Sequence, residues 1–249
     1  MWQAPMSVSG KRIVIVGGSS GIGLALAKRA AECGARLVIG GRDRDRLTAA
    51  AREIRGEVET LPVDATIELE VARFFDRVGA FDHMTVLVPS APDKSTSSRL
   101  APFLDMDPAL FESIIRNRFW SQCWGVRYGA PRISKDGSIV LMSNTQPRKI
   151  IPRYSASCAA AGAIEALARS LAVELSPVRI NVIAPGFIMT QGTANIPPAR
   201  REQWDQIARA QPVKRLGSPE EIADGMLFLM ENAYATATVL DIDGGYRLT

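Results

Sequence analysis

The sequence has few of the residues that bind metals or form disulfides. Its 249 residues include one histidine, His83, and three cysteines, Cys33, Cys123 and Cys158, which show neither paired nor metal-type spacing. A single histidine excludes a His-cluster metal site, and the surrounding "GAFDHMT" predicts that His83 lies in a surface loop. The unpaired cysteines predict reduced thiols in a cytoplasmic protein and no metal site.

Excess charge and long apolar runs are also missing. Thirty basic and 26 acidic residues give a formal net charge of +4, and no long basic run or basic–aromatic pattern is present. Such a mild balance does not indicate nucleic acid as a partner. The N-terminal "MWQAPMSVSG" has no signal-peptide apolar region, and the run "IVIV" is far too short to span a bilayer. The sequence therefore predicts no nucleic-acid and no membrane partner.

Short β-branched runs alternate with longer helical patterns along the whole chain. Apolar strands that alternate with helices are typical of a parallel sheet covered on both faces, so we expect an α/β, doubly wound fold. The strand-like runs cover 12–17, 36–40, 58–63, 84–89, 137–143, 179–185 and 238–243, and the helical stretches include 22–33, 43–55, 67–78, 107–129, 154–175 and 219–231.

A hydrophobic content of 47% and the lack of a low-complexity linker predict one domain rather than two. We expect residues 1–10 to form an N-terminal tail and residues 11–249 a single domain. Residues 90–106 and 187–217 are poor in regular pattern, and long loops at the carboxyl ends of strands carry the site in such folds. We therefore expect a substrate lid at about 187–217. Its apolar residues, which predict a largely apolar pocket, are Phe187, Met189, Ile196 and Trp204.

The stretch "GGSSGIG", Gly17 to Gly23, follows the first strand and leads directly into a helix. Glycines there permit a tight turn and a close approach of a pyrophosphate, which rests on amides at the helix N-terminus. Because a second strand follows the helix, this stretch predicts dinucleotide binding rather than a purely structural turn.

The ends of the second and third strands predict which dinucleotide binds. An acidic residue after the second strand would bind a ribose 2′-hydroxyl, but the chain has Gly41 and Arg42 in "IGGRDRDRL". A guanidinium grips phosphate, so NADP(H) is predicted, against the alternative of a solvated arginine at a helix start. Asp64 in "PVDAT" is placed to accept from the adenine amino group, and a helix N-cap role competes with this.

The stretch "YSASCAAAG" begins with Tyr154, a candidate catalytic tyrosine at the start of a helical pattern. Together with "GGSSGIG", "VDAT", Asn117 in "IIRNRFW", "LAVELSPVRINVIAPGFIMT", "RLGSPEEIADGMLFL" and "DIDGG", it makes the chain resemble the short-chain dehydrogenase/reductase family over nearly its whole length. The resemblance implies a seven-stranded Rossmann domain, NAD(P)(H), hydride transfer at a carbonyl or alcohol carbon of a small molecule, and a homo-oligomer, commonly a tetramer.

The resemblance also implies roles for individual residues. Tyr154 donates or accepts the proton, and Asn117 holds a water in the proton relay. The residues implied in cofactor binding are Gly17, Ser19, Ser20, Gly21, Ile22, Gly23, Arg42, Asp64, Ala65, Ala91, Tyr154, Pro185, Gly186, Ile188 and Thr190.

Two departures from the family pattern flank the expected active site. The family's "NNAG" after the fourth strand is "PSAP" here, Pro89 to Pro92, and two prolines remove amide donors from that wall of the cleft. At the family's catalytic serine the chain has Asn144, with Ser143 one residue earlier. Either side chain can polarise a carbonyl, but consecutive strand residues face opposite ways, so only one would point inward if the strand reaches Asn144.

The third departure is Cys158, which stands where the family has the lysine of Tyr-x-x-x-Lys. That lysine lowers the pKa of the tyrosine and holds the nicotinamide ribose, whereas a thiol, with a reference pKa of about 8.5, does neither well. A small packing residue is the simplest interpretation of Cys158. The loop before Tyr154 also carries Arg148, Lys149 and Arg153, either as solvated charges or as a substitute cation or anion site.

Two functions therefore remain open. One is an NADP(H)-dependent oxidoreductase with an altered proton relay, favoured by Tyr154, Asn117 and "PGFIMT". The other is an NADP(H)-binding protein of the same fold without hydride transfer, acting as a cyclase, an isomerase or a scaffold. Cys158, "PSAP" and the missing serine favour this second function.

Overall fold

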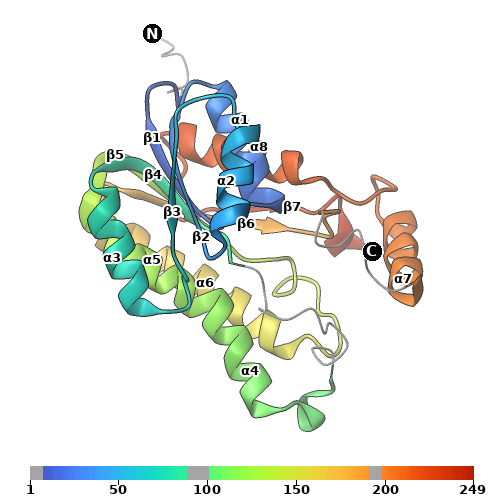
Figure 1. Cartoon of the computed structure of the whole chain (residues 1–249). Coiled ribbons are helices and arrows are strands. Elements are labelled where there is room, and N and C mark those ends of the chain that lie inside the picture. The colour runs from blue at the N-terminus through green and yellow to red at the C-terminus, as the bar shows by residue number, and fades with distance from the viewer. Residues whose placement is uncertain (1–7, 89–100, 191–197) are drawn as a thin grey trace.

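The computed structural model describes residues 8–88, 101–190 and 198–249. Seven parallel strands form one sheet in the order β3-β2-β1-β4-β5-β6-β7, which confirms the predicted doubly wound α/β fold (Figure 1). The order reverses direction between β1 and β4, and in such sheets ligands bind beyond the carboxyl ends of the strands at this point. The strands are β1 (Arg12–Val16), β2 (Arg36–Gly41), β3 (Val58–Pro62), β4 (Phe81–Val86), β5 (Ile133–Met142), β6 (Arg179–Pro185) and β7 (Val239–Ile242).

Helices cover both faces of the sheet. Helices α1, α2 and α8 lie on one face, and α3, α5 and α6 lie on the other, with α4 packed against α6 (Figure 1). Helix α7 stands apart near the C-terminus (Figure 1). The helices are α1 (Gly21–Glu32), α2 (Arg44–Glu53), α3 (Glu68–Val78), α4 (Pro108–Ile115), α5 (Ser121–Gly129), α6 (Ser155–Glu174), α7 (Pro198–Ala210) and α8 (Pro219–Glu231).

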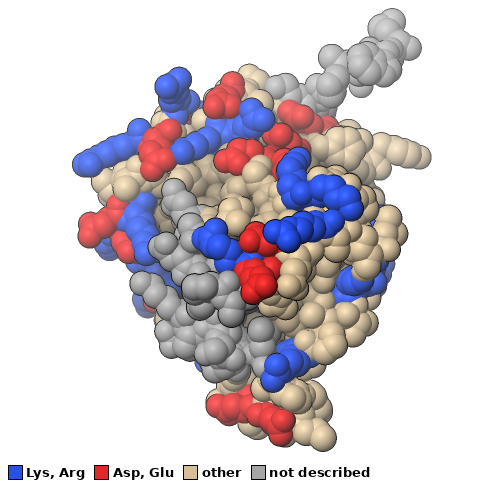
Figure 2. All heavy atoms as spheres, turned by 90° about the vertical axis from the view of Figure 1, so that its right-hand side faces the viewer, with Lys and Arg blue, Asp and Glu red and all other residues tan. Residues whose placement is uncertain are grey.

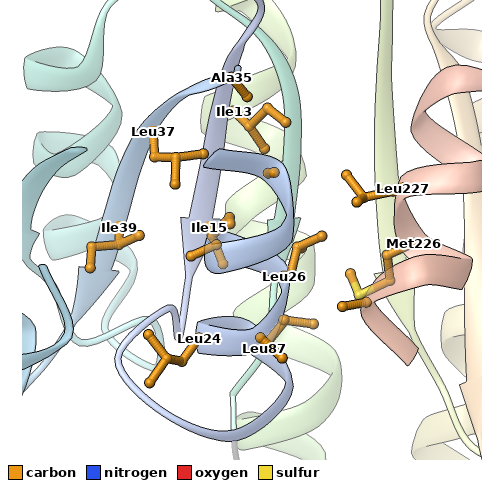
Figure 3. Close-up of a cluster of buried hydrophobic side chains, with 14 of the residues drawn as sticks. Ile13, Ile15, Leu24, Leu26, Ala35, Leu37, Ile39, Leu87, Met226 and Leu227 are labelled. Carbon is orange, nitrogen blue, oxygen red and sulfur yellow. The ribbon is translucent and has the colours of Figure 1, made fainter. Parts of the chain in front are cut away.

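Two large hydrophobic clusters cover the sheet, one on each face, and a small third cluster consists of Met106, Ile114 and Ala156. On the first face the register pairs Ile13 with Leu37 and Ile15 with Ile39, and Leu26 of α1 packs over them (Figure 3). Burying each such side chain stabilises the fold by about 1.5–3 kcal/mol. Because the strands are apolar on both sides, they position the loops at their carboxyl ends rigidly.

Two helical regions differ from the sequence-based prediction. The stretch 107–129, expected as one helix, is interrupted by a π-helical turn at Arg116–Trp120. Such turns often occur at functional positions, and this one contains Asn117. The stretch 187–217, expected to be irregular, contains α7.

The surface-loop prediction for His83 is wrong, because β4 begins at Phe81 and not at residue 84. His83 lies inside the sheet, 3% exposed, with Nδ1 2.9 Å from Oγ of Ser138 on β5. Burial lowers the pKa of His83 to about 4. The imidazole is therefore neutral in the folded protein at pH 7.

The burial of His83 predicts a loss of stability in mild acid. The unfolded chain takes up a proton near the ordinary pKa of 6.5, while the folded chain does so only near 4. Stability is therefore full above 6.5 and falls by about 1.4 kcal/mol per pH unit below it, to a total of about 3 kcal/mol. We expect urea unfolding midpoints to decline between about pH 7 and about pH 5, and His83→Gln to remove most of that decline. An equal decline in both proteins would contradict the assignment.

Among the described residues, one helix, α6, is long and apolar enough to cross a membrane by length and composition. Ala156, Ala160 and Ile164 of this helix are buried inside the protein, as in the core helix of a globular fold. Charged side chains of both signs cover the face at the right of Figure 1, where Lys and Arg lie interspersed with Asp and Glu (Figure 2). This distribution agrees with the mild net charge of the sequence.

Candidate active site

The glycine loop sits at the carboxyl end of β1, and backbone neighbours leave no room for side chains there. A Cβ on Gly17 would lie 2.1 Å from the carbonyl oxygen of Leu87, and one on Gly23 would lie 2.1 Å from that of Gly17. Gly17 also has φ +90°, which side chains rarely tolerate. The loop therefore packs the start of α1 tightly against β1.

The first turn of α1 faces this loop with free amide donors. Ser20 occupies the N-cap with no side-chain cap hydrogen bond, and Gly21 and Ile22 open the helix. Unpaired amides at a helix N-terminus attract anionic groups such as phosphate. The turn is thus suited to a pyrophosphate.

At the end of β2, Gly41 lies beside Ser19 of the glycine loop. A Cβ on Gly41 would be 3.4 Å from Ser19 Oγ. Arg42 follows, with an exposed side chain that makes no ion pair with any described residue. This corner therefore combines a small residue, a hydroxyl and an arginine whose charge is unmatched within the described structure.

Asp64 and Ala65 follow β3 at the same edge of the sheet. Oδ1 of Asp64 accepts hydrogen bonds from the backbone N–H (2.9 Å) and the hydroxyl (2.7 Å) of Thr66. Helix α3 begins at Glu68 with Ile67 at its N-cap, so the competing N-cap role of Asp64 is wrong. The bonds from Thr66 fix the carboxylate in place and use only one of its two oxygens.

The segment after β6 runs next to the glycine loop. Pro185 ends β6, and Gly186 lies against β7, where a Cβ would be 2.8 Å from Asp243 Cα. Thr190 then reaches Gly21, since its Cγ2 would be 3.7 Å from a Cβ there. Ile188 between them is buried. The glycine loop, the end of β2 and the segment after β6, which come from distant parts of the chain, are thus neighbours. Ala91 and the rest of "PSAP" lie outside the described residues.

Tyr154 stands at the N-cap position of α6, half-buried, with its carbonyl accepting from Cys158 N–H at 2.9 Å. Asn117 is buried in the π-helical turn, which packs against α6. Its backbone carbonyl accepts a hydrogen bond from Ser121 Oγ at 2.6 Å. The π-helical turn therefore holds Asn117 against the helix that begins at Tyr154.

Ser143 and Asn144 point in different directions, and β5 ends before both, at Met142. Ser143 Oγ donates to Glu165 Oε1 at 2.8 Å, in the interior. Asn144 Nδ2 donates to Ser157 Oγ at 3.2 Å, one turn along α6 from Tyr154. Both partners belong to α6, but Ser157 lies three residues after Tyr154 and Glu165 eleven residues after it, so Asn144 is the one bonded near the tyrosine.

Arg148 is not a solvated loop charge. Its guanidinium donates to Glu165 Oε2 at 2.7 Å and to Asp241 Oδ1 at 2.8 Å, of which Glu165 is buried and Asp241 is half-buried. Arg247 forms a further ion pair with Asp241. Glu165 was not predicted from the sequence, although a lone carboxylate in the apolar run "AAAGAIEALA" was a signal for a buried partner.

Cys158 lies against the backbone of the same loop. Its thiol donates to the carbonyl oxygen of Gln146, with 3.6 Å between the sulfur and the oxygen. Gln146 is itself buried, and its Oε1 has no hydrogen-bond partner among the described residues. The short loop therefore packs directly on the helix face one turn after Tyr154.

Gln122 of α5 is a further residue that sequence reasoning missed. Its side chain accepts from Met142 N–H at 2.7 Å and donates to Met142 C=O at 2.9 Å. Met142 is paired with β6 on one side, but on the other side β4 already ends at Val86. The carboxamide of Gln122 takes the place of a strand partner on that side. Gln122 thus fixes the strand end that precedes Ser143 and Asn144.

A hollow of about 960 Å³ lies at the opposite edge of the sheet, where the strands begin. Two of its arginines are already paired, since Arg12 pairs with Glu59 at 3.0 Å and Arg132 pairs with Asp76, and none of the predicted site residues lines it. We therefore place the candidate site at the carboxyl edge.

Comparison with known proteins identifies the family of the chain. A family model described as "Enoyl-(Acyl carrier protein) reductase" matches residues 16–247. The chain belongs to the short-chain dehydrogenase/reductase family. Relatives in this family include the cis-4-hydroxycyclohexanecarboxylate dehydrogenase of Sinomonas cyclohexanicum, 31% identical over 94% of this chain and 95% of its own. The 2,5-dichloro-2,5-cyclohexadiene-1,4-diol dehydrogenase LinX of Sphingobium indicum is 31% identical over 97% and 98%.

Solved structures of the family share the fold. A small-chain dehydrogenase in complex with NADPH has 27% identity and a TM-score of 0.78, covering 97% of this chain and 100% of that one. The relatives are named as dehydrogenases and reductases, so the chain is a member of an oxidoreductase family.

Proposed function

We propose that the protein is an NADP(H)-dependent oxidoreductase that acts on a carbonyl or alcohol group of a small, largely apolar molecule. The observation that carries the proposal is the meeting of the glycine loop with Thr190 at one edge of the sheet, the edge at which Tyr154 begins α6. The two 31%-identical relatives are named for hydroxylated six-membered rings, which supports an alicyclic alcohol or ketone.

The residues present fit the dinucleotide. Gly17 and Gly23 allow the loop to pack closely on the backbone of Leu87 and of Gly17, and the first turn of α1 that follows supplies amides for the pyrophosphate. Asp64 would hold the adenine, and Thr190 would lie over the pyrophosphate. When bound, the cofactor supplies or accepts the hydride.

Arg42 supports NADP(H) over NAD(H), because Gly41 leaves room for a 2′-phosphate and Arg42 can pair with it. A charge-assisted hydrogen bond contributes about 1.5–3 kcal/mol, so Arg42→Ala should weaken NADPH binding about ten- to a hundredfold and leave NADH nearly unchanged. Titration of intrinsic fluorescence would measure both affinities. Arg44→Ala, at the exposed start of α2, is the matched control. Equal affinity of the unmodified protein for both cofactors would refute the assignment.

In this proposal Tyr154 exchanges a proton with the substrate oxygen, and Asn144 polarises it through a carboxamide N–H. Ser143 is assigned no contact with substrate, because its hydroxyl is committed to Glu165. Cys158 stands at the position of the family's lysine and contributes no cation. The proton relay from Tyr154 towards Asn117 is therefore altered.

A second function, cofactor binding without hydride transfer, is favoured by one observation. Within the described structure neither Arg148 nor Lys149 bonds to Tyr154: Arg148 is held by two carboxylates and Lys149 lies on the ring of Tyr246. Such a protein would act as a cyclase, an isomerase or a scaffold. NADPH oxidation against a panel of cyclic ketones, quinones and imines separates the two functions, since only the first gives turnover.

We further propose a homo-oligomer, and a tetramer in particular. The exposed faces of the chain carry large apolar side chains, and such patches mark interfaces. A monomer in light scattering at micromolar concentration would contradict this. The exposed residues are Phe103, Leu104, Trp120, Ile150, Val173 and Phe228.

A further inference from the structure

Three aromatic side chains from separate segments form a continuous wall at the carboxyl edge of the sheet. The ring of Tyr246, near the C-terminus, lies 5.1 Å from that of Phe187 at 79°. Phe187, two residues after Pro185, lies 5.4 Å from Trp204 of α7 at 80°. Edge-to-face packing of this kind favours a fixed arrangement of the rings. We call Tyr246, Phe187 and Trp204 the aromatic wall.

Lys149 adds a positive charge to this wall. Its ammonium lies 5.5 Å from the centre of the Tyr246 ring, within the range of a cation–π contact. It forms no ion pair with a carboxylate in the described ranges. An ammonium has three N–H donors, and the ring faces only one side of it, so Lys149 keeps donors for another group.

The carboxylates in this region are already engaged. Glu165 and Asp241 accept from Arg148, and Asp241 also pairs with Arg247. Asp243 accepts from the backbone amides of Gly245 and Arg247. These carboxylates therefore do not neutralise Lys149. An anionic ligand can do so.

The wall also lies near the proposed catalytic tyrosine. Tyr246 carries Lys149 on its ring, and burial and, after it, the charge of Tyr154 raise the pKa of Tyr246. Lys149 is five residues before Tyr154 in the same loop. A ligand on the wall would thus lie within reach of both Lys149 and Tyr154.

We propose that this site recognises a flat, ring-sized carboxylate whose ring packs on Phe187, the half-buried member of the aromatic wall beside the buried Tyr246 and Trp204, and whose carboxylate binds Lys149. The inference rests on the proposed function, because it names the substrate class of the same site. The carboxylate would lie at the end of the ring remote from the group that reacts at Tyr154.

Binding of unreactive probes tests this without hydride transfer. Calorimetry of the full chain with 2-naphthoate and with 2-naphthamide compares ligands of one shape that differ in charge. We expect naphthoate to bind about tenfold tighter or more, as a charge-assisted bond implies. Lys149→Gln should reduce naphthoate affinity to that of naphthamide. Tyr246→Leu, which keeps apolar bulk, should weaken both probes severalfold.

Lys135→Gln removes the same charge at the opposite edge of the sheet and should leave the ratio of the two affinities unchanged. Equal binding of the two probes, no binding of naphthoate, or an unchanged ratio in Lys149→Gln would overturn the proposal. An absence of NADPH oxidation together with the expected naphthoate binding would refute the redox function alone, so the two failures are distinguishable.

Discussion

Tyr154→Phe is expected to lower the rate of ketone reduction by about 10²–10⁴-fold, the usual contribution of a positioned acid–base group. The change removes one hydroxyl from a half-buried side chain at the start of α6. Because the ring remains, we expect the affinity for NADPH and the unfolding midpoint to stay close to those of the parent. Steady-state NADPH oxidation at a saturating ketone concentration measures the loss in kcat.

Tyr128→Phe provides the control for this experiment. Tyr128 donates its hydroxyl to Glu68 at 2.7 Å on the surface of α5, so the same deletion there should leave turnover unchanged. If Tyr154→Phe retained the parent kcat, Tyr154 would not be the proton donor. The reaction would then need another acid.

The parts of the fold that the sequence predicted correctly are those specified by local pattern. Helix α8 begins and ends as predicted at 219–231, because Ser218 and Glu221 form a capping box and Pro219 occupies its first turn. The predicted start of β4 was wrong, because Asp82 has the appearance of a loop residue. Its carboxylate is satisfied by Arg12 N–H and Ser134 Oγ, which are 70 and 52 residues away in the chain.

The same distinction applies to the candidate site. Glycines and prolines restrict the backbone locally, so the loop at Gly17–Gly23 and the segment from Pro185 were recognisable in the sequence. The ion pair of Arg148 was not recognisable in the sequence, because its partner Asp241 is 93 residues away and a loop arginine normally remains solvated. Which of Ser143 and Asn144 bonds near the start of α6 likewise depends on where β5 ends, at Met142, whose backbone is held by the side chain of Gln122.

Restoring a lysine at position 158 is expected to increase carbonyl reduction. An ammonium one turn after Tyr154 lies on the same helix face and would stabilise the phenolate, whose reference pKa is about 10. The tyrosine would then be a stronger acid near neutral pH. Cys158→Lys should therefore raise kcat about tenfold or more, a part of the 10²–10⁴-fold available, and shift the pH–rate profile towards neutral.

Two control variants separate the effect of the lysine's charge from the effects of side-chain size and of position in the chain. Cys158→Met introduces a long neutral side chain at the same place and should give no gain. Cys33→Lys introduces the same charge at the exposed C-cap of α1 and should give none either. A different outcome is expected if a cation of the loop before Tyr154 already performs the role of the family's lysine. If Arg148, Lys149 or Arg153 has taken over the role, Cys158→Lys should do nothing or harm, and replacing that one residue by Ala should abolish turnover.

The packing around Cys158 favours the gain over that alternative. Among the described residues the thiol bonds to a backbone carbonyl, Arg148 is paired with the carboxylates of Glu165 and Asp241, and Lys149 lies on the ring of Tyr246. A lysine at position 158 would find an acceptor in the carbonyl oxygen of Gln146. Within the described structure no cation is bonded to Cys158, so none would repel the new ammonium there. If neither the parent nor Cys158→Lys transfers hydride while NADPH binds tightly, the lysine position is not what limits the reaction. The protein would then use its cofactor site without redox chemistry.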